Sequence, residues 1–333
     1  MVTWTRLSTD DAATWDSQLK HFEGHSLYQT WRWGRYKNAR GWNPQHFQAV
    51  AHGSAVAMLQ ALVRTYPLRT MVAWCPGGPV GALDACTPES MRQLSDLMGA
   101  RSLYFRSHFL RVKNDVDEQS LRSNGWTRPN HRVGTNMTAV WDLTQSEEQL
   151  LAGLNRDWRY NLRQAHKRGL TTERLVEPPI EELSDLCRAM NAAKGVSATV
   201  REAELVALFE ALGDHAVVVG CRNRSGRLIA FRSCGLYDHR AWELAAATSN
   251  EGRREGASFA ALWSLILHCR KMGVTHYDLA GVDDVNVPGV ASFKRRTGAQ
   301  GVEWLGEWEW STSTLLRNVL DLTVRHRSGA ALP

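Results

Sequence analysis

The stretch SFKRRTGAQGVEWLGEWEW, residues 292–310, joins a cationic cluster to a strong strand signal. From residue 303 onward, two sets of residues alternate with period 2 for eight residues. They are Trp304, Gly306, Trp308 and Trp310 on one face, and Glu303, Leu305, Glu307 and Glu309 on the other. This pattern predicts a β-strand whose tryptophan face is buried in a sheet.

Three consecutive cations precede that strand. Lys294, Arg295 and Arg296 follow Phe293 and come before Gly298, so we expect them on the turn that leads into the strand. A side chain on such a turn can point into a cleft, where fixed positive charge suits an anionic ligand or the oxyanion of an acyl transfer. Solvated surface charge is the alternative interpretation.

A second segment that mixes aromatic and basic residues lies near the N-terminus, SLYQTWRWGRYKNARGWNP at residues 26–44. Helical spacing places Trp33 and Lys37 near one face of this segment. Residues 74–84, WCPGGPVGALD, then supply a Pro/Gly turn of the kind that brings backbone close to a ligand. Both segments are candidates for substrate binding.

Residues 153–169 predict an amphipathic helix with a cationic face. The apolar stripe consists of Leu154, Trp158, Leu162 and Ala165, which lie within about 80° of one another at 100° per residue. The opposite stripe consists of Arg156, Arg159, Arg163 and Lys167. Solvated helices usually mix charges of both signs, so a single-sign stripe favours contact with phosphates, as in a tRNA acceptor arm or a nucleotide diphosphate. A solvated face is the alternative.

Several common chemistries find no support in the sequence. It contains no G-x-S-x-G, Walker or G-x-G-x-x-G motif. Its histidines and cysteines lack zinc-finger spacing, so no metal site is expected. The loop RREGAS, residues 253–258, approaches the R-x-x-G-x-G/A loop that holds a CoA pyrophosphate on a helix N-terminus, but it departs at the last position. Loops rich in Arg and Gly between a hairpin and a helix are also common without CoA.

The length of 333 residues predicts two domains of about 150 residues each. With 43% apolar residues and 14 tryptophans, each domain can bury a full core. We expect a cytoplasmic enzyme, because no signal peptide is evident and the longest apolar run, residues 259–267, is too short to cross a bilayer. The six cysteines form no C-x-x-C pair and are expected to be reduced and buried. The net charge of +6 is a modest lean toward polyanions.

A coarse internal repeat organises the chain, because the order hairpin, strand, helix, strand occurs twice. The first copy turns at residues 52–54 and ends in the strand SLYFR, whereas the second turns at residues 223–226 and ends in VTHYDLAG. The repeat predicts an α/β (α+β) fold of two tandem units. We expect the boundary near residue 145, where Asp142, Thr144 and Ser146 offer helix-start signals. Residues 311–333 predict a helix that packs back on the first domain.

Four motifs, taken in order, resemble those of the FemABX family of peptidyltransferases. They are Ser26, Gln29, Trp33 and Lys37; Pro76, Gly78 and Pro79; Asn161, Arg163, Lys167 and Gly169; and Phe293, Lys294 and Gly298. The resemblance implies two tandem GCN5-related N-acetyltransferase-like (GNAT-like) domains, residues 1–145 and 146–310. Some members carry a coiled-coil arm in the second domain, but no heptad stretch of that kind occurs here, so we expect no arm.

The resemblance also implies the reaction, which is transfer of an aminoacyl group from aminoacyl-tRNA to an amine, usually on a peptidoglycan precursor. The ester of the donor is already activated, so the reaction needs no ATP, metal or other cofactor. The attacking amine must be neutral, and its attack creates a tetrahedral oxyanion that a nearby ammonium can stabilise. Lys294 is the catalytic candidate for that role, or for neutralising the departing ribose oxygen.

Further roles are assigned to residues that match the family motifs or lie beside them. Lys37 and Arg201 are candidates for binding an acceptor phosphate, although a valine stands near Arg201 where the family often has an aromatic residue. Other acceptor contacts are expected from Trp33, Tyr237 and Tyr277. The candidates for tRNA binding are Arg156, Arg159, Arg163, Lys167, Arg295 and Arg296. Asp278, at a strand end, is either a base or a structural turn acceptor.

Three functional hypotheses therefore stay open. The first is a tRNA-dependent aminoacyltransferase acting on a cell-wall precursor or a small peptide-like metabolite, with peripheral contact to a membrane left open. The second is an acyl-CoA-dependent N-acyltransferase on the same scaffold, for which the 253–258 loop would have to hold pyrophosphate. The third is a non-catalytic RNA-binding protein, for which interleaved aromatic and basic residues would suffice.

Overall fold

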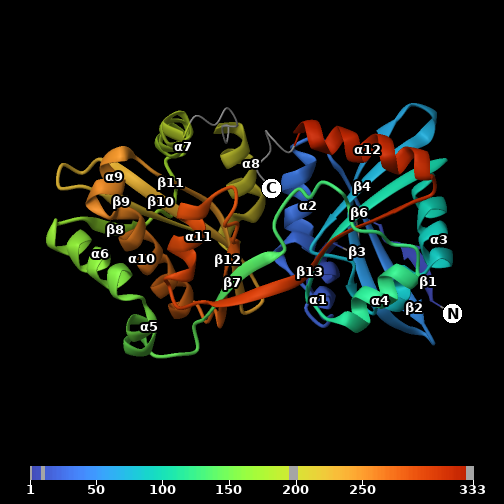
Figure 1. Ribbon diagram of the computed structural model, residues 1–333, viewed down its shortest axis with the longest axis horizontal. Helices are drawn as coiled ribbons and strands as arrows, with labels where there is room; N and C mark the ends of the chain where they lie inside the picture. The colour runs from blue at the N-terminus through green and yellow to red at the C-terminus, as the bar shows by residue number, and fades with distance from the viewer. Residues whose placement is uncertain (1, 9–11, 195–201, 328–333) are drawn as a thin grey trace. The chain divides into compact units, whose positions relative to one another are not determined.

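The computed structural model (Figure 1) describes residues 2–8, 12–194 and 202–327. The chain divides into two compact units, each built around its own mixed β-sheet. Among the described residues, unit 1 comprises 2–8, 12–136 and 303–327, and unit 2 comprises 137–194 and 202–302. The predicted α/β fold of two tandem units is confirmed.

Unit 1 has a sheet in the order β1-β2-β3-β4-β6-β13, with the short β5 paired to β3. Its strands are β1 (Thr3–Arg6), β2 (Asn43–Ala51), β3 (Ser54–Tyr66), β4 (Thr70–Pro76), β5 (Val80–Gly81), β6 (Ser102–Val112) and β13 (Gln300–Ser311). The predicted hairpin forms between β2 and β3. β4 and β6 run parallel and are joined through a helix, as a crossover between parallel strands requires.

Helices and short 3-10 turns surround that sheet. They are α1 (Ala12–Leu19), η2 (Leu27–Gln29), α2 (Trp31–Asn38), η3 (Pro67–Arg69), η4 (Leu83–Cys86), α3 (Pro88–Met98), α4 (Asp115–Ser123) and α12 (Thr314–Arg327). The core is apolar and rich in aromatic rings, including Phe105 packed edge-on against Trp126. In α12, Arg317 Nη1 donates to Thr127 Oγ1 at 3.3 Å, so this helix contacts unit 1.

Unit 2 has a sheet in the order β7-β12-β11-β10-β9-β8. Its strands are β7 (Met137–Asp142), β8 (Thr171–Arg174), β9 (Ala216–Arg222), β10 (Leu228–Tyr237), β11 (Arg240–Thr248) and β12 (His276–Gly281). β9, β10 and β11 form the predicted meander, and β11 pairs in parallel with β12. The nearly continuous apolar run of β9 fits a strand covered on both faces.

Helices and one 3-10 turn complete unit 2. They are α5 (Glu147–Gly153), α6 (Arg156–Lys167), α7 (Ile180–Lys194), α8 (Glu202–Leu212), η5 (Gly213–His215), α9 (Asn250–Glu255), α10 (Ala257–Lys271) and α11 (Pro288–Arg295). α10 packs on β9 and β10 and also contacts α6, whereas α7 contacts β10 and β11 (Figure 1). Within the described ranges, no helix is longer than 15 residues or apolar enough to cross a membrane.

The division between the units lies at residues 136 and 137 rather than near residue 145. The expected boundary followed the strand that ends at Asp142, but this strand, β7, pairs with β12 and so belongs to unit 2. The chain also returns to unit 1 at Glu303, earlier than residue 310, because β13 pairs with β6 from Trp304 onward. The sequence showed the strands but not their partners.

Candidate functional site

The parallel strands β11 and β12 pair only over their first three residues. Arg240, Ala241 and Trp242 pair with residues 276–278, and no further pair joins these two strands in the part of the chain that the structure describes. The neighbouring β10 has a bulge between Arg232 and Cys234. Bulges re-aim side chains and are frequent beside active sites. The point where β11 and β12 separate is therefore the candidate position of an active site in unit 2.

Four buried charged side chains gather at that point. They are Arg232 on β10, Glu243 on β11, Asp278 on β12 and Lys294 on α11, each 7–8% exposed. The guanidinium of Arg232 forms an ion pair with Glu243, donates to Ser258 Oγ at 3.0 Å, and lies 4.7 Å from the ring centroid of Phe293. Charges are rarely buried unless they are paired or have a function. We call these four side chains the charged cluster.

Lys294 is the catalytic candidate, and its position differs from the expected one. It does not lie on a turn, because Pro288 starts a helix that carries Lys294 and Arg295 in its last turn. The Nζ atom donates to the carbonyl of Gly281 at 2.9 Å. Burial lowers the pKa of Lys294, and the carboxylates of Glu243 and Asp278 oppose that shift. A lysine has three donors, and one is used here among the described residues, so two can serve a reacting group.

Asp278 is a turn acceptor in this structure. Its Oδ1 accepts from Thr138 Oγ1 and, at 2.8 Å, from the backbone N–H of Ala280. Ala280 has a φ of +59°, a conformation that costs energy for a residue with a Cβ. Burial raises the pKa of Asp278. Of the two roles considered for this residue, the contacts show the structural one.

Several buried polar atoms around the charged cluster have no hydrogen-bond partner among the described residues. They are Arg232 Nε, Glu243 Oε2, Trp158 Nε1 and Tyr277 Oη. Native structures contain few buried polar atoms without a hydrogen-bond partner, and a bound ligand or water is a common partner for them. Tyr277 is fully buried and its pKa is raised by that burial, so its hydroxyl lies in the core rather than on a surface that faces solvent. Tyr237 is also buried, at 7% exposed.

The cationic helix α6 has the predicted amphipathic pattern. Leu154, Trp158, Leu162 and Ala165 are all buried. On the opposite face, Arg163 and Lys167 are exposed, as is Arg156. Arg159 differs from them, because its Nη1 donates to the carbonyls of Ala152 and Leu154 at 2.6 Å each and so closes the end of α5.

The two arginines next to Lys294 both make ion pairs. Arg295 pairs with Asp284, and Arg296 pairs with Asp157 at 3.1 Å. About half of each arginine side chain stays exposed, so both can still reach an anionic ligand. Arg201 lies outside the described residues.

The loop before α10 forms the expected glycine turn. Gly256 has a φ of +81° and caps α10 without a side-chain hydrogen bond. A Cβ at this glycine would lie 3.2 Å from the carbonyl oxygen of Asn161, so α6 packs directly against the loop. The turn has the backbone of an anion-binding loop, but part of its approach is occupied by α6.

Within unit 1, the N-terminal motif residues are held together by Gln29. Its amide donates to the carbonyls of Gln60 and Pro76, and its oxygen accepts from the backbone N–H of Gln60 at 2.8 Å. A Cβ on Gly77, which has a φ of +73°, would lie 2.3 Å from Ser26 Oγ. The Pro/Gly turn therefore needs glycine at position 77, because a Cβ there would clash with the segment of residues 26–29.

Trp33 and Lys37 lie on one face of α2, as the helical spacing predicted. Lys37 Nζ is 4.9 Å from the ring centroid of Trp33 and 4.8 Å from that of Tyr36. Tyr28 packs edge-on against Trp33. These aromatic rings fix the position of the ammonium by cation–π attraction while leaving the side chain half-buried.

Sequence reasoning missed a polar network beside β13. Glu307 and Glu309 of β13 are both buried. Glu307 pairs with Arg106 and accepts from the backbone N–H groups of Val133 and Gly134 at 2.9 and 2.8 Å. An arginine inside the apolar strand SLYFR was the available signal, because a buried strand arginine needs a buried anion.

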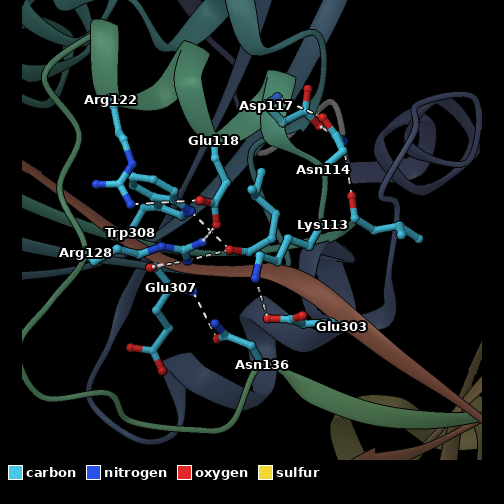
Figure 2. Close-up of polar contacts among 12 residues, drawn as sticks. Lys113, Asn114, Asp117, Glu118, Arg122, Arg128, Asn136, Glu303, Glu307 and Trp308 are labelled. Carbon is cyan, nitrogen blue, oxygen red and sulfur yellow. Dashed lines mark hydrogen bonds and ion pairs between the residues drawn. The ribbon is translucent and has the colours of Figure 1, made fainter.

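Figure 2 shows the neighbouring part of this network, where Arg128 lies between Glu118 of α4 and the indole of Trp308. Its guanidinium lies 4.0 Å from the Trp308 ring centroid and donates to the Glu307 carbonyl at 3.1 Å. Lys113 and Glu303 form a separate ion pair at 2.9 Å (Figure 2). These contacts hold β13 to the loop and helix that precede unit 2, so the network has a structural role.

No group of three potential metal ligands gathers in the described ranges, although His21 and His25 are four residues apart. The six cysteines are buried and free, as expected.

Known proteins share this architecture. Residues 155–295, from α6 to α11, match the model of the acetyltransferase (GNAT) domain. The chain is similar to the crystal structure of FemX, with a TM-score of 0.79 and 17% identity over 96% of this chain and 99% of that one. The chain has the fold of FemX. The FemABX-like recognition is confirmed at this level.

Two further solved structures are similar at lower scores. One is the C-terminal domain of a putative lysylphosphatidylglycerol synthetase from Agrobacterium fabrum, with a TM-score of 0.56, 15% identity, and coverage of 94% of this chain and 97% of that one. The other is a tandem GNAT protein from the clavulanic acid biosynthesis pathway, with a TM-score of 0.58, 12% identity, and coverage of 94% and 99%. No curated protein sequence matches the chain. These solved structures share the fold of this chain.

Proposed function

We propose that this protein transfers an aminoacyl group from aminoacyl-tRNA to an amine of a peptidoglycan precursor or a small peptide-like metabolite, forming an amide. The observation that carries the proposal is the buried Lys294 where β11 and β12 separate, with donors left over and a lowered pKa. An ammonium held in a site of low dielectric stabilises an oxyanion far more than it would in water.

The proposed reaction follows from that geometry. The neutral amine attacks the ester carbonyl, and a C–N bond forms as the carbonyl oxygen becomes an oxyanion that Lys294 stabilises. The intermediate collapses, the C–O bond to the ribose breaks, and the amine proton is transferred in the end to the ribose oxygen. A lysine whose pKa is lowered by burial gives up a proton more readily than an ordinary lysine. It suits both the oxyanion and the leaving oxygen.

The proposed donor is tRNA because of the exposed cations of unit 2. Arg156, Arg163 and Lys167 on α6 are exposed, and no ion pair engages them within the described residues. Arg295 and Arg296 extend this positive surface from the last turn of α11. We propose that these cations bind phosphates of the acceptor arm, and that Lys37, held over two aromatic rings, binds a phosphate of the acceptor.

An acyl-CoA donor is the alternative, and the uncapped glycine turn before α10 favours it. The experiment that separates the two donors uses the purified protein with a panel of amines and either aminoacyl-tRNA or acyl-CoA. Mass spectrometry identifies the product. We expect an aminoacylated amine whose formation stops when RNase is added first and does not respond to CoA thioesters. RNase-resistant product formation from acetyl-CoA would instead establish the alternative.

A further inference from the structure

The tip of the β3–β4 hairpin in unit 1 has an unusual backbone and an exposed apolar side chain. Leu68 and Arg69 have φ values of +59° and +52°, and they are consecutive residues with a Cβ. Leu68 is 77% exposed. A left-handed conformation costs each such residue roughly 1 kcal/mol. Backbone strain of this kind is often found at functional sites. Here the strained turn holds a leucine out in solvent.

Further apolar and aromatic residues lie near this tip. Tyr66 precedes it and is 45% exposed. Two residues earlier, on the same face of β3, the guanidinium of Arg64 lies 4.3 Å from the ring centroid of Trp42. The turn thus presents a leucine at its end and a tyrosine behind it, followed by an arginine stacked on a tryptophan.

The first turns of α12 lie at the same end of the sheet. The backbone N–H of Arg101, just before β6, donates to the Arg69 carbonyl at 3.0 Å. Two residues further, Leu103 exchanges hydrogen bonds with Thr312, just before α12. Leu315 and Val319 of α12 are 75% and 53% exposed. They lie one helical turn apart, on a face away from Arg317, which contacts Thr127.

Three arginines lie around the tip. Arg64, Arg69 and Arg101 make no ion pair within the described part of the chain. We call the tip surface the set Arg64, Tyr66, Leu68, Arg69, Arg101, Leu315 and Val319. Exposed aliphatic side chains, an aromatic ring and unpaired arginines together match a bilayer interface, where apolar groups enter the acyl boundary and cations meet anionic headgroups.

We propose that the tip surface docks unit 1 on an anionic membrane. The apolar end decides between a membrane and a nucleic acid, because RNA contact would use the arginines but gives no reason to hold Leu68 in solvent by a strained turn. Binding through three aliphatic side chains, a tyrosine and three cations is weak and reversible, which suits an enzyme that visits a surface. The inference does not depend on the donor or the chemistry proposed for unit 2.

The test uses the full-length protein and sedimentation with vesicles of phosphatidylcholine, with or without one quarter phosphatidylglycerol. The variant Leu68→Asn/Arg69→Gly removes the leucine and one cation, and both new residues tolerate a positive φ. Removing one cation near an anionic surface corresponds to about fivefold weaker partitioning, and removing the leucine adds about tenfold or more. The variant should melt at the same or a higher temperature, so misfolding cannot explain weaker binding.

The matched control is Val176→Asn, which removes a side chain that is 81% exposed in unit 2. We expect the wild type and this control to bind anionic vesicles alike, more weakly as salt rises, with little binding to pure phosphatidylcholine. Turnover of a water-soluble amine acceptor should be the same in all three proteins. Equal vesicle binding by wild type and the double variant, or no binding by wild type, would overturn the proposal. Loss of tRNA binding in the double variant, with vesicle binding intact, would assign the surface to nucleic acid and overturn it as well.

Discussion

Replacing Lys294 with methionine tests the chemistry of the charged cluster. Methionine keeps the length and apolar stem of lysine but removes the ammonium and its hydrogen bond to Gly281. If Lys294 stabilises an oxyanion that exists only in the transition state, kcat should fall by roughly 10²–10³, the equivalent of about 2.7–4 kcal/mol for one missing donor. The KM for the acceptor should stay within about twofold, because the substrate ground state does not need this donor.

The control for this experiment is Lys271→Met, the same chemical change at an exposed lysine of α10 in the same unit. It should leave both constants near the wild-type values. Lys37→Met should behave in a third way and raise the acceptor KM with little change in kcat, because a phosphate clamp binds ground state and transition state alike. Steady-state kinetics of the three variants decide the matter. A change in KM alone for Lys294→Met would make Lys294 a binding residue and refute the reasoning.

Four further predictions concern charge and backbone. The double variant Arg163→Gln/Lys167→Gln should bind tRNA with a weaker salt dependence. The slope of the logarithm of the binding constant against the logarithm of the salt concentration should become shallower by about 0.7–0.9 for each lost phosphate contact. An unchanged slope in filter binding would show that the cations of α6 face solvent and do not contact tRNA. Because burial lowers the pKa of Lys294 below its ordinary value of 10.5, the unfolded chain binds more protons between the two pKa values, and stability rises with pH across that window. The melting temperature of wild type relative to Lys294→Met should therefore increase from pH 7 to pH 10, and a decrease would contradict the burial. Glu307→Gln leaves Arg106 buried without its anion and should cost about 3–5 kcal/mol in urea unfolding, whereas Glu303→Gln, at an exposed pair, should cost under about 1 kcal/mol. Gly77→Ala should cost about 1–3 kcal/mol, because the new Cβ meets Ser26 Oγ at a positive φ, whereas Gly53→Ala meets no neighbouring atom and should cost only the strain of its own φ.

The elements of the fold were predictable because they depend on local pattern. The hairpins, the helix of residues 257–271 and the apolar stripe of α6 follow from period and turn residues. Strand partners were not predictable in the same way, because pairing joins residues far apart in the chain. This is why β7 was assigned to the wrong unit, and why the pairing of Glu307 with Arg106, about 200 positions earlier in the chain, was not predicted.

The candidate site shows the same limit. The sequence identified Lys294 through its neighbours Phe293 and Gly298, but it gave no sign that Arg232 and Glu243 would surround it. These two residues lie within apolar strands, and a single charged residue in an apolar strand does not indicate which residue it will pair with. Lys294 itself was expected on a turn because it comes shortly before Gly298 and the strand that follows. Pro288 at the first turn of α11 was the signal for a helix there.

The two units start from the same order of elements, and their parallel strand pairs show where they differ. In unit 1, β4 and β6 stay paired over seven residues, from Thr70 to Pro76. In unit 2, β11 and β12 separate after three. A pair that stays closed has its backbone groups satisfied within the sheet, whereas a pair that opens exposes backbone donors and acceptors and leaves room for a reacting group. The charged cluster and its unpartnered atoms lie at the open pair, so we propose that the chemistry belongs to unit 2. In this proposal unit 1 provides binding surfaces, namely the aromatic face around Lys37 and the tip surface around Leu68.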